Sequence, residues 1–155
     1  NAPIETMSDD DFVGVMDINI IGMWKCTREA VKIMKEKGGG SIVNTSSLTS
    51  RHGSPNQSAY SVSKFAVRGL TRAVSREVGK YGIRVNSVSP GVVMTEMAVL
   101  ARPGGEQMME GMKRMTALGR TATPEDMAGS FLFLASDEAA FVTGAIIDCD
   151  GGIIM

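Results

Sequence analysis

A tyrosine and a lysine, Tyr60 and Lys64, stand four residues apart in a segment whose apolar residues have helical spacing. Four residues is close to one helical turn, so both side chains are expected on the same face of a helix. An ammonium group beside a phenol stabilises the phenolate and lowers the pKa of a phenol from about 10 toward neutral pH. Such a pair can act as general acid and base in the interconversion of alcohols and carbonyls. The same spacing also occurs in surface pairs without a catalytic role.

Two further polar residues have positions that suit this chemistry. Ser47 stands thirteen residues before Tyr60, where a predicted strand ends. Ligands of open parallel sheets bind at that end of the strands, and a hydroxyl there can donate to a substrate oxygen. Asn19 interrupts the apolar stripe of the first helical segment, and a buried amide must be hydrogen-bonded. The amide could tie down a helix bend, serve catalysis, or do both.

Alternating helices and strands must position these residues. Ser8 and the acids after it begin a long amphipathic helix, or two helices joined by a bend, and Gly38–Gly40 end it. This glycine run is not a phosphate loop, because it closes a helix instead of opening one. The remaining expected elements are a short buried strand at 41–45, strands at 83–88 and 145–149, a loop at 48–58, and helices at 59–80 and 124–136.

Strands separated by helices of this length indicate crossover connections. The expected fold class is therefore α/β, a three-layer sandwich with a parallel sheet and helices on both faces. No internal repeat or low-complexity linker divides the chain, so residues 1–155 are expected to form one domain.

Residues 92–118 differ from the rest because they hold six of the twelve methionines. They could form a mobile substrate-binding lobe with an apolar face at Met108, Met112 and Met115. They could equally contain a helix that uses methionine to fill the core.

Composition excludes several classes of protein. The 16 basic and 17 acidic side chains give a net charge of −1, which lacks the basic footprint of a nucleic-acid-binding protein. No apolar run approaches the roughly 18 residues of a membrane span. Two distant cysteines and one histidine argue against a metal site and favour a reducing, cytoplasmic compartment. The first residues have no secretory signal and read as the middle of a loop.

Four motifs in this order resemble the short-chain dehydrogenase/reductases of the classical type, and the resemblance covers essentially the whole chain. They are the run from Ile42 to Ser47, Tyr60-Ser61-Val62-Ser63-Lys64, Arg84 to Gly91 with Thr95, and Val142-Thr143-Gly144 leading to Asp150-Gly151-Gly152. The resemblance implies a Rossmann-like, doubly wound fold. It also implies an oxidoreductase that moves hydride between NAD or NADP and an alcohol or ketone.

The resemblance assigns roles to single residues. Tyr60 would be the acid/base, Lys64 would assist it and hold the nicotinamide ribose, Ser47 would polarise the substrate carbonyl, and Asn19 would help to hold a relay water. Pro90 and Gly91 would shape the turn beside the nicotinamide, with the Val93 backbone at the carboxamide and Thr95 near the diphosphate. The family's spacing selects Ser47 over Ser46.

Two other features stay open. His52 is expected to be a solvated loop residue, although contact with a substrate is an alternative. Arg68, Arg72 and Arg76 are expected on a solvated face. The resemblance implies that this face could border a homo-oligomer interface, in a dimer or a tetramer.

The family's glycine-rich turn, its first strand and its Asn-Asn-Ala-Gly segment have no counterpart in the chain. The chain therefore matches the catalytic part of an incomplete, partial Rossmann-like domain, in which only the nicotinamide end of the cofactor site is present. We expect the isolated chain to be inactive. The alternative is a truncated, noncatalytic domain that associates through its helices or its sheet edge.

Overall fold

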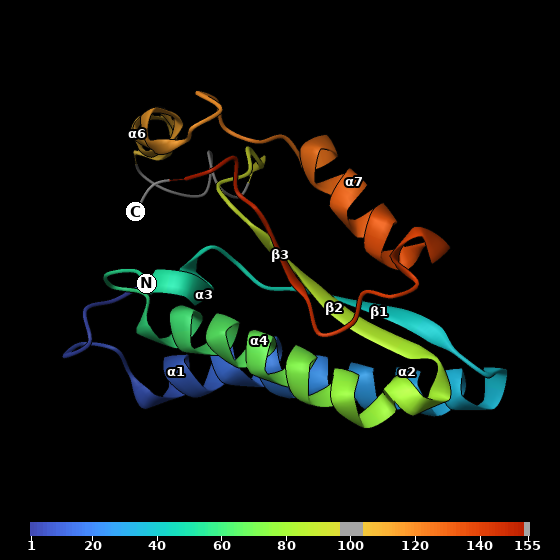
Figure 1. The fold of residues 1–155 in the computed structure, drawn as a ribbon. Coiled ribbons are helices and arrows are strands. Elements are labelled where there is room, and N and C mark those ends of the chain that lie inside the picture. Colours follow the sequence, from blue (N-terminus) through green and yellow to red (C-terminus); the bar gives the residue numbers. More distant parts are fainter. Residues whose placement is uncertain (97–103, 154–155) are drawn as a thin grey trace.

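Three parallel strands form the middle layer of the computed structural model, which describes residues 1–96 and 104–153 (Figure 1). They are β1 (Gly40–Thr45), β2 (Ile83–Pro90) and β3 (Ile146–Cys149), in the order β1-β2-β3. Gly40 pairs with Ile83, and Ser87 pairs with Ile146. The predicted parallel sheet is confirmed, and each strand lies within two residues of its predicted bounds.

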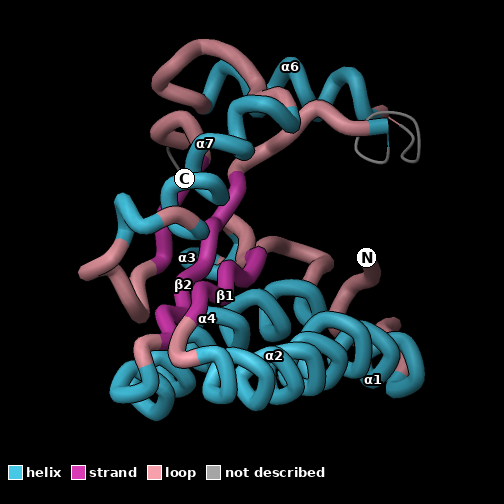
Figure 2. Tube along the Cα trace, turned by 90° about the vertical axis from the view of Figure 1, so that its right-hand side faces the viewer, coloured by secondary structure: helices cyan, strands magenta, loops and turns pink. Residues whose placement is uncertain are grey.

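Helices cover both faces of this sheet, as the sequence predicts (Figure 2). One face carries α1 (Asp9–Met16), the π-helical η1 (Asp17–Gly22), α2 (Met23–Lys37) and α4 (Ser58–Val78). The other face carries α7 (Pro124–Ala135). The shorter elements are α3 (Thr49–His52), η2 (Gly79–Tyr81), α6 (Gly105–Met115) and η3 (Asp137–Ala139). None of the described helices is both long and apolar enough to cross a membrane.

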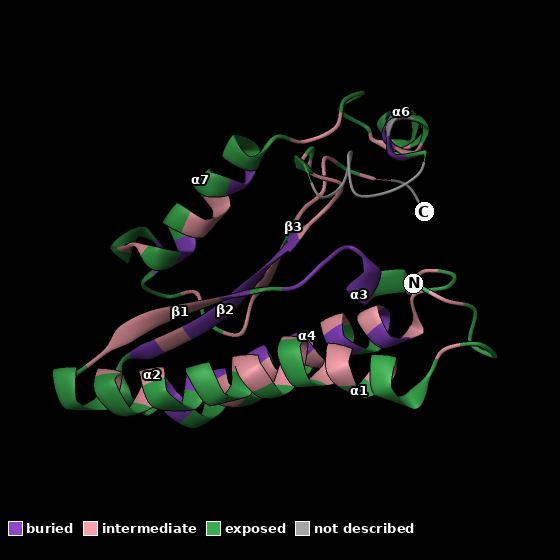
Figure 3. Ribbon diagram, turned by 180° about the vertical axis from the view of Figure 1, so that it is seen from behind, coloured by how far each residue is buried: buried purple, intermediate pink, exposed green. Residues whose placement is uncertain are grey.

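Strand alternation divides the core into two clusters. Ile83 and Val85 point from β2 toward α4 and pack with Val78. Val88 points to the opposite face and packs with Leu134 of α7 and with Ala139. Both layers therefore depend on β2, which is the most deeply buried strand (Figure 3).

The first helical segment is one helical run interrupted by a π-helical turn. The Ser8 Oγ accepts a hydrogen bond from the Asp11 N–H at 3.1 Å and caps α1. The helix then changes to π-helical pairing at η1, which contains Asn19, and resumes as α2 until Gly38. A π-helical turn inside an α-helix is uncommon and is often found at functional sites.

Two local expectations are wrong. Residues 48–58 are not entirely a loop, because Thr49–His52 form α3, closed by Gly53 with φ of 76°. Strand β1 is mostly half-buried, with only Asn44 classed as buried. In the described part of the chain β1 pairs with β2 alone, so its outer edge has no neighbouring strand to cover it.

Side chains of two strands close the end of α7. The Leu134 carbonyl accepts hydrogen bonds from the Ser41 Oγ of β1 and the Arg84 Nη1 of β2, both at 2.8 Å. The Arg84 Nη2 also donates to the Ser136 carbonyl at 2.9 Å. These donors satisfy carbonyls that a helix end leaves without partners.

Candidate active site

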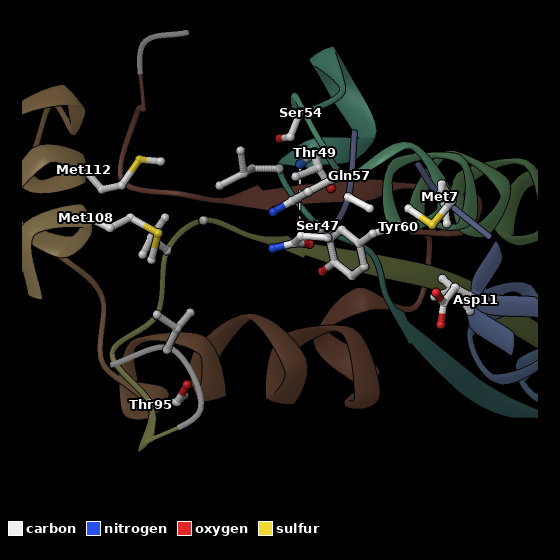
Figure 4. Close-up of a pocket in the computed structure, with 18 residues that line it drawn as sticks. Met7, Asp11, Ser47, Thr49, Ser54, Gln57, Tyr60, Thr95, Met108 and Met112 are labelled. Carbon is white, nitrogen blue, oxygen red and sulfur yellow. Dashed lines mark hydrogen bonds between the residues drawn. The ribbon is translucent and has the colours of Figure 1, made fainter. Parts of the chain in front are cut away.

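A cavity of about 640 Å³ lies at the carboxyl ends of the strands and brings several predicted site residues together (Figure 4). Ser47, Tyr60, Gly91, Val93 and Thr95 all line it. The position agrees with the general rule for open α/β sheets, in which ligands bind outside the carboxyl ends of the strands.

Ser47 directly follows the sheet and is held on both sides by the backbone of β2. The Ser46 N–H donates to the Val88 carbonyl at 2.8 Å, and the Leu48 N–H donates to the Pro90 carbonyl at 2.9 Å. The Ser47 Oγ accepts the Thr49 N–H at 3.3 Å. Because this bond uses an oxygen lone pair, the hydroxyl proton stays available for donation into the cavity.

Ser46 differs from its neighbour. Its side chain is buried, and its Oγ lies 3.1 Å from the Lys64 carbonyl oxygen and 3.0 Å from the Ser50 Oγ. Ser46 is not among the residues that line the cavity, whereas Ser47 is.

Helix α4 presents Tyr60 to the cavity and holds Lys64 behind it. The Lys64 Nζ lies 5.6 Å from the centre of the Tyr60 ring. The same Nζ donates to the Thr45 carbonyl at the end of β1, at 3.0 Å. Burial lowers the pKa of the Lys64 ammonium below its ordinary value, because a low-dielectric environment disfavours the charged form.

Asn19 lies outside the cavity and reaches Tyr60 through one intermediate side chain. The Asn19 Nδ2 donates to the Ser63 Oγ at 3.0 Å, and the Ser63 Oγ donates to the Tyr60 carbonyl at 2.7 Å. The sequence predicts that the Asn19 amide is hydrogen-bonded, and the structure supplies its partner.

The segment after β2 forms another wall of the cavity. A Cβ at Gly91 would lie 2.7 Å from the Asp150 Cα, so this close approach requires glycine. The Val92 carbonyl and the Met94 N–H both bond to Ala122. Strand alternation therefore turns the Val93 N–H and C=O away from Ala122. Pro90 ends β2 and is not among the lining residues.

Helix α6 lies in the methionine-rich residues 92–118, for which the sequence allows two interpretations. Met108 and Met112 line the cavity across from Ser47 and Tyr60 (Figure 4), whereas Met109 is buried. Met115 is exposed and does not line the cavity. The segment therefore supplies both a cavity wall and a core residue, and its residues 97–103 lie outside the described part.

Two groups of residues around the cavity are not predicted from the sequence. Gln57 and Asp11 line it although their spacing gives no catalytic signal. A cluster of four charged residues beside it comprises Arg51, Arg68, Asp148 and Asp150. The expectation of a solvated face is wrong for Arg68, whose Nη1 donates to the buried Ser50 Oγ at 3.2 Å.

His52 is exposed on α3 and is not among the cavity-lining residues. Within residues 1–96 and 104–153, no group of three or more histidine, cysteine or acidic side chains is arranged to hold a metal ion.

Comparison with known proteins gives concordant matches. The family described as enoyl-(acyl carrier protein) reductase matches residues 1–154. A 3alpha-hydroxysteroid dehydrogenase of Mediterraneibacter gnavus is 47% identical over 142 residues, which are 92% of this chain and 56% of the relative. A 3-oxoacyl-[acyl-carrier-protein] reductase of Thermotoga maritima is 37% identical and is matched over 100% of this chain and 62% of its own length.

Solved structures share the fold. A 4-hydroxyisoleucine dehydrogenase complexed with NADH and succinate superposes with a TM-score of 0.89 at 36% identity, covering 97% of this chain and 62% of that one. A gluconate 5-dehydrogenase from Burkholderia cenocepacia in complex with NADP and tartrate gives 0.90 at 29% identity, with 97% and 59% coverage. The chain spans about three-fifths of the length of these relatives. The fold, the family match and these relatives agree, and the chain belongs to the short-chain dehydrogenase/reductase family.

Proposed function

We propose that the protein is an NAD- or NADP-dependent oxidoreductase that interconverts a small-molecule alcohol and its ketone or aldehyde. The observation that carries this proposal is that Ser47 and Tyr60, from two different elements, line the same cavity. Both hydroxyl groups can donate a hydrogen bond to the same substrate oxygen. The relatives complexed with NADH and NADP support the choice of cofactor.

In this proposal Tyr60 gives a proton to the substrate oxygen, or removes it, while Ser47 donates a hydrogen bond to that oxygen. Lys64 assists Tyr60, since the Thr45 carbonyl holds the Lys64 Nζ near the phenol ring. Asn19 acts on Tyr60 through Ser63.

The residues on the far wall suit a nicotinamide cofactor, which supplies or accepts the hydride when bound. Gly91 keeps the turn free of a side chain, and the Val93 N–H and C=O offer the donor and acceptor that a carboxamide needs. Tyr60, Lys64, Pro90 and Thr95 complete the proposed cofactor contacts.

Residues 92–118 are the proposed substrate-binding lobe. Met108 and Met112 make its described wall apolar, which favours substrates with an apolar body beside the reacting carbon. The relatives' names cover a hydroxysteroid, an oxoacyl group and gluconate, so the chemistry at the reacting carbon is the shared part of the proposal.

The test uses the complete gene product with both reduced and oxidised nicotinamide cofactors and a panel of secondary alcohols and ketones. Tyr60→Phe is expected to lower kcat by about 10²–10⁴-fold, because it removes the proton donor. Tyr81→Phe is the matched control, since Tyr81 is the second of the two tyrosines and is exposed. Full activity in Tyr60→Phe would refute the assignment.

The second candidate function is association without catalysis, and the outer edge of β1, which no strand of the described residues covers, favours it. The sequence of the 155 residues lacks the glycine-rich turn that binds the cofactor diphosphate. We therefore propose that these 155 residues alone are inactive. Titration of this chain with NADH and NADPH, followed by fluorescence and turnover, separates the two: turnover by the chain alone would contradict the proposal.

We further propose a cytoplasmic homo-oligomer, a dimer or a tetramer. Ile18 of η1, Trp24 of α2 and Phe65 of α4 are exposed on the helices of one sheet face, and a second copy would cover them. Light scattering of the complete gene product measures the oligomer, and a monomer would contradict this part.

A further inference from the structure

We propose that Ser50 and Arg68 form a positioning pair that fixes Ser47 for catalysis. The inference rests on the proposed function, and it concerns two residues that do not line the cavity. The buried Ser50 hydroxyl and the Arg68 guanidinium, which comes from another helix, meet next to the Ser47 carbonyl.

Ser50 is 1% exposed and lies in α3, three residues after Ser47. Its Oγ donates to the Ser47 carbonyl at 2.6 Å, and its backbone N–H donates to the same carbonyl at 2.9 Å. The two bonds hold the peptide group of Ser47 from one side. Fixing this peptide group restrains the ψ angle of Ser47 and thereby the backbone from which its side chain projects.

Two donors orient the Ser50 hydroxyl: the Ser46 Oγ at 3.0 Å and, from another helix, Arg68. Its Nη1 lies 3.2 Å from the Ser50 Oγ, which leaves the hydroxyl proton to point at the Ser47 carbonyl. A charged donor makes a stronger hydrogen bond than a neutral one. Arg68 comes from α4, the helix that also carries Tyr60, so the pair links the two proposed catalytic residues.

The guanidinium of Arg68 is itself held in place. Its Nη1 lies 3.7 Å from the carboxylate of Asp148, a residue of β3. Arg51 of α3 reaches the same carboxylate at 3.5 Å and the Asp150 carboxylate at 3.2 Å. The charges of this cluster balance, so we interpret it as a brace between α3, α4 and β3 and not as an anion site.

Tyr60 has a matching arrangement. Ser63 donates to the Tyr60 carbonyl three residues before it and accepts the Asn19 amide, as Ser50 does with Ser47 and Arg68. Both proposed catalytic residues, Ser47 and Tyr60, are thus held by a buried serine that a second side chain orients.

The experiment is a double-mutant cycle between Ser50→Ala and Ser47→Ala in the complete gene product. Ser50→Ala is expected to lower kcat about tenfold with little change in the KM for cofactor, because the loss arises in the transition state. In the Ser47→Ala background the same change should have no further effect on kcat. A purely structural role would lower activity equally in both backgrounds.

Ser75→Ala is the matched control. Ser75 is also buried in a helix, and its Oγ donates to the Arg72 carbonyl three residues earlier, far from the cavity-lining residues. This variant should keep the wild-type kcat and KM. If Ser50→Ala does not fold, Arg68→Met tests the same hydrogen bond from the partly exposed side, and Arg68→Lys should restore most of the activity that Arg68→Met loses.

Unchanged kcat in both Ser50→Ala and Arg68→Met, alongside an inactive Tyr60→Phe, would overturn this inference and leave the proposed function intact. If Ser50→Ala lowered activity equally in wild type and in the Ser47→Ala background, the inference would also be overturned. An active Tyr60→Phe would instead overturn the proposed function.

Discussion

The Asn19 Nδ2 lies 3.0 Å from the Ser63 Oγ, and this contact joins the π-helical turn η1 to the helix that carries Tyr60. The two residues are 44 positions apart in the sequence. The irregular turn thereby holds the Tyr60 backbone through a single side chain, which gives the interruption of the first helix a physical role.

Replacing Asn19 by alanine should lower kcat by about three- to tenfold, since a hydrogen bond of this kind contributes about 0.5–1.5 kcal/mol. The effect should disappear when Ser63 is already alanine, because Ser63 transmits it. Steady-state kinetics of the two single variants and the double variant, made in the complete gene product, measure the coupling. Additive losses would show that Asn19 acts by another route.

Gly91→Ala should destabilise the protein by about 1–3 kcal/mol and weaken cofactor binding, because the new methyl group would lie 2.7 Å from the Asp150 Cα. Gly111→Ala is the matched control, since nothing lies within 4 Å of a Cβ at that position of α6. It should stabilise the helix by about 0.5–1 kcal/mol. Urea unfolding and cofactor titration measure both variants, and wild-type cofactor affinity in Gly91→Ala would contradict the expectation.

Met112→Lys should raise the KM for apolar substrates about tenfold with little effect on kcat, because it places a charge in the apolar wall of the cavity. Met115→Lys lies on the same helix but outside the cavity lining and should leave the KM unchanged. Equal effects of the two changes would argue against α6 as the substrate wall.

Lys64 should make stability depend on pH in a defined direction. Burial lowers its folded-state pKa below the ordinary 10.5, so between these two values the unfolded chain binds the proton and the folded chain does not. The free energy of unfolding of wild type should therefore rise, relative to Lys64→Met, as pH increases through this window toward 10.5.

Urea unfolding over a series of alkaline pH values tests this expectation. Lys80→Met is the control for loss of a lysine from an exposed position. Parallel pH profiles of wild type and Lys64→Met would count against the buried ammonium.

The start of α7 should lose stability in acid. Hydrogen bonds from the Arg120 guanidinium, at 2.7 Å for its Nη2, and from the Thr123 N–H, at 2.8 Å, hold the pKa of the Asp126 carboxyl well below its usual range. A depressed carboxyl pKa stabilises the fold above the ordinary value of 3.8, and this stabilisation is lost as pH falls below it.

Asp126→Asn should therefore lower the Tm at neutral pH, and its Tm should converge with that of wild type in acid. Asp137→Asn, in η3 after the same helix, controls for the loss of one negative charge. A Tm difference that persists unchanged in acid would contradict the role of the Asp126–Arg120 pair.

The sequence predicts the features that depend on neighbours along the chain. The cap at Ser8 and the common helix of Tyr60 and Lys64 follow from local spacing. It does not predict α3, because four residues have too little periodicity to read. It also misplaces Arg68, because the acceptor of its hydrogen bond, Ser50, lies in a different element. Nor does the sequence predict that Ser63 is the partner of Asn19, because Ser63 also lies in a different element.

The closure of α7 by Ser41 and Arg84 has a consequence for cooperativity. The Leu134 carbonyl receives donors from residues 93 and 50 positions earlier in the chain. Both donors lie within reach of this carbonyl only when β1 and β2 are paired, so the hydrogen bonds that complete the last turn of α7 depend on the pairing of the strands. The end of α7 therefore keeps its hydrogen bonds only while the sheet is intact, although α7 itself gives no backbone hydrogen bond to the sheet.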